Sequence, residues 1–306
     1  MLSRTADHLY WMSRYMERAE NIARFLDVAS RFSLSGADKL AVWQPVLTIA
    51  GDPKDFADFY GEVSAGTVID WSVINLNNPS SIHACLRAAR ENAHAVRSVL
   101  PNELWEAINS TWLGVKGVDG HRLRDEGLTG FCDWVKERSH LSRGVTYGTM
   151  LRDEPYQFLR LGTFLERADN TARLLGVRAA GFSLEGEVDP SDTMHWAAVL
   201  RSVSAFKAYR TLFKDDVDPA AAVRMLMLMD EVPRSLHFCM DQVSEILDQL
   251  CGSFECARLA GAAHAALHWG RLDQLLTEGL DIFIARFIED NEALGTQIHA
   301  DFMMSA

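Results

Sequence analysis

The chain has few cysteines and prolines for its length, with 5 Cys and 8 Pro among 306 residues. The thiols are odd in number and widely scattered, without a Cys-x-x-Cys pair, which favours neither a disulfide framework nor a cysteine-based zinc site. We therefore expect reduced thiols, each buried and inert. They are Cys85, Cys132, Cys239, Cys251 and Cys256.

Basic residues are also fewer than acidic ones. The chain carries 30 Lys and Arg residues against 42 Asp and Glu residues, which gives a formal net charge of -12. Sequence-independent binding to a phosphate backbone requires clustered Lys and Arg side chains. We therefore do not expect nucleic acid as a partner.

Long hydrophobic runs are missing as well. The most apolar stretch, around residues 226–229, falls far short of the roughly 18 to 20 residues that span a bilayer. Charged residues such as Arg4, Asp7 and Arg14 interrupt the first 16 residues, so this segment lacks the apolar centre of a signal peptide. These absences predict a cytoplasmic protein with no membrane segment and no membrane partner.

Alternating runs of the β-strand type are absent too, whereas apolar residues recur at helical spacings of three and four. Proline placement agrees, because Asp or Asn before Pro caps the free amides of a helix start. Four dipeptides have this form: Asp52-Pro53, Asn78-Pro79, Asp189-Pro190 and Asp218-Pro219. With 48% hydrophobic residues to form a core, the sequence predicts an all-α fold.

Three pairs of similar segments occur in the same order along the chain. Residues 16–28 resemble 165–177, residues 43–47 resemble 196–200, and residues 79–85 resemble 233–239. Their offsets, all about 150 residues, predict a tandem duplication. We expect a first helical repeat at residues 1–150 and a second at residues 151–306, related by a pseudo-two-fold axis and merged into one globular unit with one core. Two separately folded bundles are the alternative.

The first pair of similar segments carries a Glu-Arg dipeptide on a mostly apolar helix. Helical positions i, i+4 and i+7 stack, so each segment presents a Glu-Asn-Arg stripe with a second arginine beside it. A helix that is apolar around most of its circumference lies at the centre of its bundle. The candidate polar site comprises Glu17, Arg18, Asn21, Arg24, Glu166, Arg167, Asn170 and Arg173.

Buried charges at these positions need partners. Across a pseudo-two-fold axis, Glu17 would meet Arg167 or Arg173, and Glu166 would meet Arg18 or Arg24. Two interpretations stay open. The residues form a structural network that fixes how the halves dock, or they line a pocket for an anionic group, with a glutamate as orienting group or base. The catalytic residues, if any, are unknown. Arg90, Asn92 and Arg97 repeat the pattern loosely and are secondary candidates.

Metal and cofactor motifs are weak. Glu91 and His94 form one Glu-x-x-His pair, whereas di-iron carboxylate bundles use two. His264 and His268 lie one helical turn apart, with no third ligand recognisable in the sequence. The chain has no phosphate-binding glycine loop, which argues against ATP binding by the chain itself. We therefore predict no metal site and no cofactor.

Several of these segments together resemble a known family. They are Met16-Glu-Arg-Ala-Glu-Asn, Leu165-Glu-Arg-Ala-Asp-Asn, the opening Met1-Leu-Ser-Arg-Thr-Ala-Asp-His-Leu-Tyr-Trp and Pro233-Arg-Ser. They are similar to the bacterial alpha-E family, a helical domain of unknown function named for a Glu-Arg motif. The motif carries over to Glu17, Arg18, Glu166 and Arg167, without a catalytic role.

The resemblance implies an association with circularly permuted ATP-grasp ligases, beside which such proteins are encoded or to which they are fused. We therefore expect a helical partner or accessory subunit of an ATP-grasp amide-ligase system for peptide synthesis or protein modification, which binds the ligase or its peptide substrate. The alternative is an enzyme that acts on carboxylate or peptide substrates with a site formed by the two Glu-Arg helices. The sequence leaves a homo-oligomer open.

Overall fold

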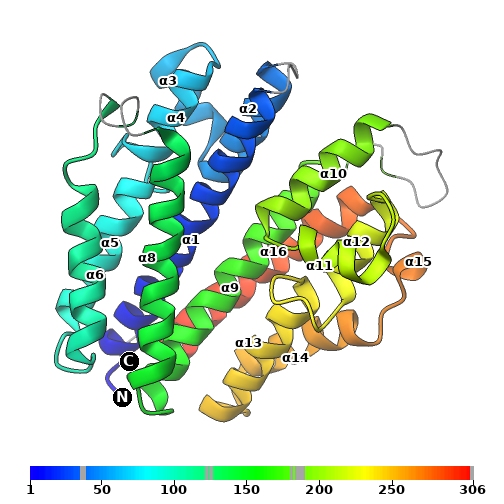
Figure 1. The fold of residues 1–306 in the computed structure, drawn as a ribbon. Helices are drawn as coiled ribbons and strands as arrows, with labels where there is room; N and C mark the ends of the chain where they lie inside the picture. The colour runs from blue at the N-terminus through cyan, green and yellow to red at the C-terminus, as the bar shows by residue number, and fades with distance from the viewer. Residues whose placement is uncertain (35–38, 121–122, 124–126, 180–181, 183–189, 304–306) are drawn as a thin grey trace. The chain divides into compact units, whose positions relative to one another are not determined.

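Every regular element in the described part of the chain is helical (Figure 1). The computed structural model describes residues 1–34, 39–120, 123, 127–179, 182 and 190–303. The all-α prediction is therefore confirmed. The chain forms two compact units, unit 1 at Met1–Thr163 and unit 2 at Phe164–Ala306. The duplication, the repeats at residues 1–150 and 151–306 and their merger into one core stay predictions.

Unit 1 contains seven of the described helices and the beginning of an eighth, which continues into unit 2. In chain order they are α1 (Ser3–Ser33), α2 (Lys39–Ala50), α3 (Pro53–Tyr60), α4 (Ala65–Val73), α5 (Ile82–Ala95), α6 (Asn102–Val115), α8 (Leu128–Thr149) and α9 (Glu154–Gly176).

Unit 2 contains the rest of α9 and the helices that follow it. These are α10 (Pro190–Ser202), α11 (Phe206–Phe213), α12 (Pro219–Leu228), α13 (Leu236–Cys251), α14 (Glu255–His268), α15 (Leu272–Leu275) and α16 (Leu280–Ile298), with a π-helical turn at His299–Met303. Helix α13 packs mainly against α14, and α14 also contacts α16.

Helix α1 lies at the centre of unit 1, where it packs mainly against α5 and α8. Its buried residues include Leu9, Ile22 and Leu26, which lie on more than one face of the helix, and also the charged Glu17 and Glu20. Burial on several faces is typical of a helix surrounded by its neighbours. The glutamate of the Glu-Arg dipeptide, Glu17, is therefore buried inside unit 1.

Three of the four predicted helix starts agree with the structure. The side chains of Asp52 and Asp218 accept hydrogen bonds from backbone amides in the first turns of α3 and α12, and proline follows each. Helix α10 begins at Pro190, although Asp189 lies outside the described residues.

The fourth start, at Asn78-Pro79, is wrong. Helix α5 begins at Ile82 and is capped by Ser81, whose Oγ accepts a hydrogen bond from the Ala84 amide. The Asn78 side chain is fully buried and donates to the backbone carbonyls of Ala50 and Trp71, at 2.8 and 3.0 Å. Asn78 therefore joins two other segments of unit 1 instead of capping a helix.

All five cysteines are free, as expected, and only Cys251 among them is not buried. Burial raises the pKa of Cys132, and burial together with a hydrogen bond to Asp301 raises the pKa of Cys256 to about 12. Both thiols are therefore protonated and unreactive near neutral pH. None of the described helices is both long enough and apolar enough to cross a membrane.

A close approach between helices in unit 1 gives the first prediction. A Cβ atom added at Gly162 of α9 would overlap the Ser13 Oγ and the Tyr10 carbonyl oxygen of α1. We expect Gly162→Ala to lower the free energy of unfolding by about 1–3 kcal/mol, because a packed contact has no room for the methyl group. Urea denaturation followed by circular dichroism measures this change.

Gly144 is the matched control, because it lies inside α8 with nothing within 4 Å of an added Cβ. There, Gly144→Ala should raise the free energy of unfolding by roughly 0.5–1 kcal/mol through a lower backbone entropy cost. Equal effects at the two positions would contradict the close approach of α9 to α1.

Candidate functional site

A cluster of charged side chains joins α1 to α8 inside unit 1. Glu17 and Glu20 of α1 are 1% and 0% exposed. Arg143 of α8 donates through Nη1 to Glu17 Oε2 at 2.8 Å and also to Glu20 Oε2. One guanidinium group therefore holds both buried carboxylates.

Further partners of Glu20 come from both helices. Its Oε1 accepts from Arg24 Nη2 at 2.6 Å and from Arg24 Nε at 2.9 Å, one helical turn along α1. Its Oε2 also accepts from the hydroxyl of Ser139 at 2.7 Å. We call Glu17, Glu20, Arg24, Ser139 and Arg143 the Arg143 cluster.

The charges of the Arg143 cluster balance, since two carboxylates face two guanidinium groups. A buried carboxylate is tolerated only when it is paired and hydrogen-bonded, and charge-assisted bonds of this kind are stronger than neutral ones. The exposed His140 side chain lies at the edge of the cluster, with its Nε2 3.1 Å from Arg24 Nη2. The arrangement stabilises the packing of α1 against α8.

The cavity beside the Arg143 cluster is small. It has a volume of about 40 Å³ and is lined by Met12, Leu104, Ile108 and members of the cluster. That space holds a few water molecules, whereas sites for small-molecule ligands usually measure roughly 300–1,000 Å³. Within unit 1, the geometry favours the structural network over a binding pocket.

The second Glu-Arg segment, on α9 in unit 2, uses a related pair. Arg173 donates to Asp169 one turn earlier, from Nε to Oδ2 at 2.7 Å, as Arg24 does to Glu20. It also donates to Glu292 of α16 at 2.9 Å. Burial opposes the charge of Arg173, but the bonds and charges of Asp169 and Glu292 outweigh it and raise the arginine pKa.

The other predicted residues of this segment are buried. Glu166, Arg167 and Asn170 are 3%, 8% and 7% exposed. Arg167 donates to the Pro233 carbonyl at 3.3 Å. This hydrogen bond, with that from the Thr171 hydroxyl to the Arg234 carbonyl at 2.9 Å, attaches α9 to the segment that precedes α13 within unit 2.

The pairings that we expected across a pseudo-two-fold axis, of Glu17 with Arg167 or Arg173 and of Glu166 with Arg18 or Arg24, would join the two units and stay predictions. Arg18 lies over the Tyr15 ring, with its guanidinium carbon 5.9 Å from the ring centroid.

The secondary candidates contact other groups of unit 1. Asn92 Oδ1 lies 2.7 Å from Nδ1 of His8 on α1. The guanidinium groups of Arg90 and Arg97 lie over the Trp105 ring, at 5.6 and 5.1 Å from its centroid. These contacts lie outside the Arg143 cluster.

The sequence reasoning missed Glu20, Ser139 and Arg143. The Glu20–Arg24 spacing of i, i+4 is a local signal that could have identified Glu20. Arg143 is separated from Glu17 by 126 positions in sequence, and nothing in its local sequence marks it as the partner.

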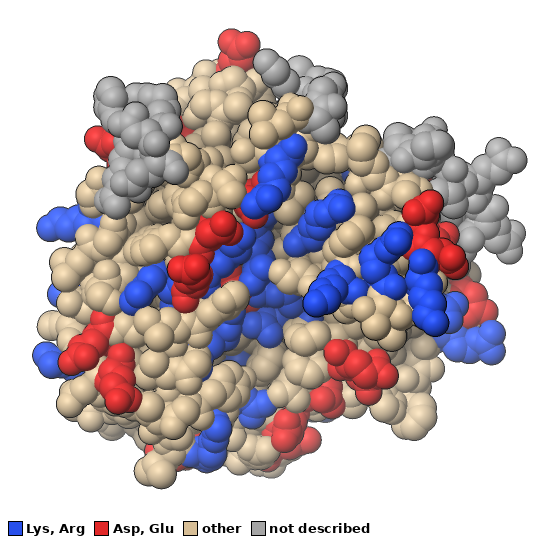
Figure 2. Space-filling model, viewed as in Figure 1, with Lys and Arg blue, Asp and Glu red and all other residues tan. Residues whose placement is uncertain are grey.

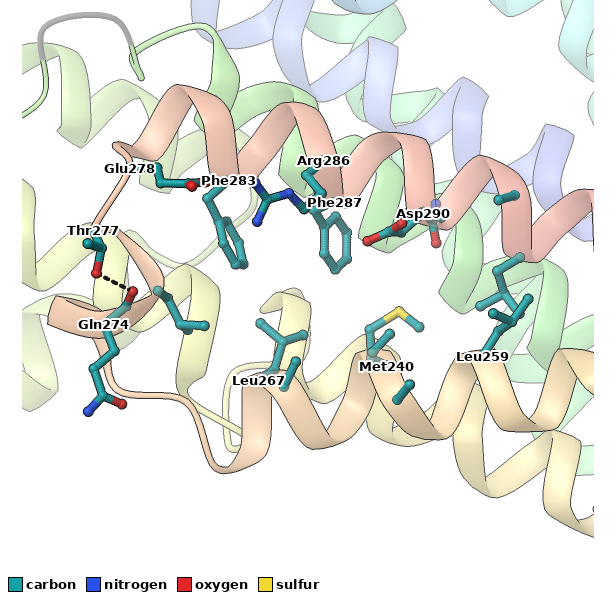
Figure 3. Close-up of a pocket in the computed structure, with 17 residues that line it drawn as sticks. Met240, Leu259, Leu267, Gln274, Thr277, Glu278, Phe283, Arg286, Phe287 and Asp290 are labelled. Carbon is teal, nitrogen blue, oxygen red and sulfur yellow. Dashed lines mark hydrogen bonds and ion pairs between the residues drawn. The ribbon is translucent and has the colours of Figure 1, made fainter.

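Unit 2 contains a larger hollow, which we call the α14–α16 groove. It has a volume of about 620 Å³, and α13 and α15 complete its walls. Phe283 and Phe287 project from α16 towards Leu259 and Leu267 of α14, with Met240 of α13 between the helices (Figure 3). The interior is therefore mainly apolar.

Polar groups occur along one wall of the α14–α16 groove. Arg286 donates to Glu278 at 2.6 Å, so these two charges neutralise each other. Asp290 brings a further carboxylate to the lining. Asn291 is 5% exposed, and its Oδ1 is buried without a hydrogen-bond partner in the described part of the chain.

Both signs of charge also occur across the face of the molecule shown in Figure 2, where Lys and Arg side chains are interspersed with Asp and Glu. Within each unit, several of these charges form exposed pairs, such as Arg258 with Glu255 at 2.6 Å. Such exposed pairs contribute little to stability.

Comparison with known proteins gives a family and distant relatives. The Alpha-E model, described as a predicted alpha-helical domain with a conserved ER motif, matches residues 1–303. Uncharacterized proteins of Mycobacterium tuberculosis and Mycobacterium bovis are each 26% identical over 282 residues, which covers 83% of this chain and 30% of the relative. The chain thus spans less than a third of the length of these relatives. No solved structure gives a significant match.

The Arg143 cluster gives the second prediction. Arg143→Met removes the shared partner of two buried carboxylates, so we expect the free energy of unfolding to fall by roughly 3–5 kcal/mol. Urea denaturation at neutral pH measures the loss.

Arg31→Met serves as the control, because Arg31 pairs with Asp27 on the same helix but its side chain is 62% exposed. Here the loss should stay below about 1 kcal/mol. If Arg143→Met were as mild as Arg31→Met, the cluster would not hold α1 to α8.

Proposed function

The chain belongs to the Alpha-E family, and we propose that it serves in the cytoplasm as a helical accessory subunit of an ATP-grasp amide-ligase system for peptide synthesis or protein modification. Its α14–α16 groove binds an apolar segment of the ligase's peptide substrate. The ligase supplies the ATP chemistry, and this chain holds the substrate.

The size and lining of the α14–α16 groove carry this proposal. A volume of about 620 Å³ suits a short stretch of peptide with one or two large side chains. Apolar contact surface occurs on both walls (Figure 3). The rings of Phe283 and Phe287 provide it on α16, and the side chains of Leu259 and Leu267 provide it on α14. Burial of an apolar side chain between them contributes about 25 cal/mol for each Å² removed from water.

The charges of the groove lining decide which peptide fits. The carboxylate of Asp290 is the remaining charge of the lining, since Glu278 is already paired with Arg286. The preferred peptide therefore carries a basic residue next to its apolar anchor.

The mycobacterial relatives support an accessory role. The matched segment makes up 30% of their length, so in these proteins an Alpha-E-like segment is joined to a much longer polypeptide. A helical module that works next to another protein is consistent with this arrangement.

The alternative, an enzyme whose site lies at the Glu-Arg helices, has weaker support. Glu20 accepts bonds from Arg24, Ser139 and Arg143, and Glu17 shares the same arginine. The cavity of about 40 Å³ beside them is too small for a peptide or a carboxylate substrate of similar size.

The third prediction tests the α14–α16 groove. Ala266 is an exposed residue of α14 that lines it, so Ala266→Arg places a long charged side chain in the space that the peptide needs. We expect the wild-type protein to bind the substrate peptide of its proposed ATP-grasp partner, and the variant to bind at least tenfold more weakly. Isothermal titration calorimetry measures both affinities.

Ala265→Arg is the matched control, because Ala265 is the exposed neighbour on the same helix and does not line the α14–α16 groove. It should bind the peptide as the wild type does. Absence of binding by the wild-type protein at micromolar concentrations would contradict the proposed function, and equal losses in both variants would contradict the location of the site.

A further inference from the structure

Three histidines of unit 2 meet between α13 and α14. Each offers a ring nitrogen, and these atoms from His237, His264 and His268 all lie within 4.8 Å of one another. The closest pair is His237 Nε2 and His268 Nδ1, at 3.1 Å. His264 and His268 had no recognisable third ligand in the sequence, and the fold supplies one from the preceding helix.

The Leu228 carbonyl orients the His237 ring. It lies 2.9 Å from Nδ1, so the N–H at Nδ1 donates to it and the lone pair is at Nε2, the atom that faces His268. A backbone carbonyl on the other ring nitrogen is the usual outer contact of a histidine that binds a metal, because it fixes the tautomer and the ring plane.

His264 contributes the second independent observation. Its Nε2 is buried and makes no hydrogen bond within the described part of the chain, although Asp241 Oδ1 lies 3.5 Å away. A buried ring nitrogen without a hydrogen bond is costly unless another ligand takes it up.

We propose that His237, His264 and His268 bind one Zn²⁺ ion, with water in the fourth position. Zn–N bonds of about 2.0–2.1 Å in a tetrahedron place ligand nitrogens roughly 3.3 Å apart, close to the separation of His237 and His268. Small side-chain rotations bring the third nitrogen into range. Three histidines and one open position form the donor set of catalytic zinc sites rather than closed structural ones.

The surroundings suit an ion that is reached from solvent. His237 is buried, His264 is half-buried and His268 is exposed, so one side of the cluster is open. Asp241 lies beside His264 and supplies a carboxylate that accepts a hydrogen bond from the bound water.

The corresponding histidine of unit 1 does not have these neighbours. His83 occupies the place that the sequence similarity aligns with His237, and its ring contacts Trp112, with centroids 5.1 Å apart. Among the described residues, the three-histidine arrangement is found in unit 2. His83 is therefore a natural control for the metal site.

Titration of the purified full chain with Co²⁺, followed by competition with Zn²⁺, tests the proposal. We expect one Co²⁺ per chain, with the visible absorption of a tetrahedral site, and displacement by Zn²⁺. His268→Ala, at an exposed position, should abolish this signal while circular dichroism stays unchanged. Asp241→Asn should weaken binding by about 10–100-fold, the usual effect of an outer partner.

His83→Ala should bind Co²⁺ as the wild-type protein does. The proposal is overturned if the wild-type protein shows no Co²⁺ absorption in excess metal, or if His268→Ala keeps the wild-type spectrum and affinity. Neither outcome bears on peptide binding in the α14–α16 groove, which is tested by calorimetry without metal.

Discussion

The pairing of two buried carboxylates with one arginine is the constraint on which unit 1 depends. Glu17 and Glu20 lie inside the bundle because α1 is surrounded by α5 and α8, and a charge in that position requires a partner from a neighbouring helix. Arg143 supplies it from α8, and Ser139 one turn earlier also donates to Glu20. The same contacts that satisfy the charges also fix how the two helices pack. In unit 1, the Glu-Arg helix therefore has a structural role.

Unit 2 combines its own Glu-Arg segment with two candidate sites. Its Glu-Arg segment follows the same local rule, since Arg173 binds Asp169 as Arg24 binds Glu20. Its other helices form two further features, the α14–α16 groove and the histidine cluster between α13 and α14. Both involve α14, which presents apolar residues to the groove and His264 and His268 to α13. A helical chain without a catalytic motif in its sequence thus carries its candidate sites on one helix and its neighbours.

Local features were accessible from the sequence, and long-range partners were not. The all-α class, the helix starts at Asp52 and Asp218 and the inert thiols follow from spacing and capping rules that act within a few residues. Asn78 failed because its side chain is used for a tertiary contact that no local rule includes. Burial of Glu17 was predictable from the apolar surroundings on its own helix, but Arg143 was not, and the same holds for His237 beside His268. Each of these partners comes from a distant segment, and its position depends on the fold.

A double-mutant cycle between Glu17 and Arg143 tests the central claim most directly. Urea denaturation of Glu17→Gln, Arg143→Met and the double variant isolates the interaction between the two side chains from their separate packing effects. If the buried pair holds α1 to α8, the double variant loses less stability than the sum of the single variants, with a coupling energy of about 1–3 kcal/mol. Additive losses, with a coupling energy near zero, would contradict the account.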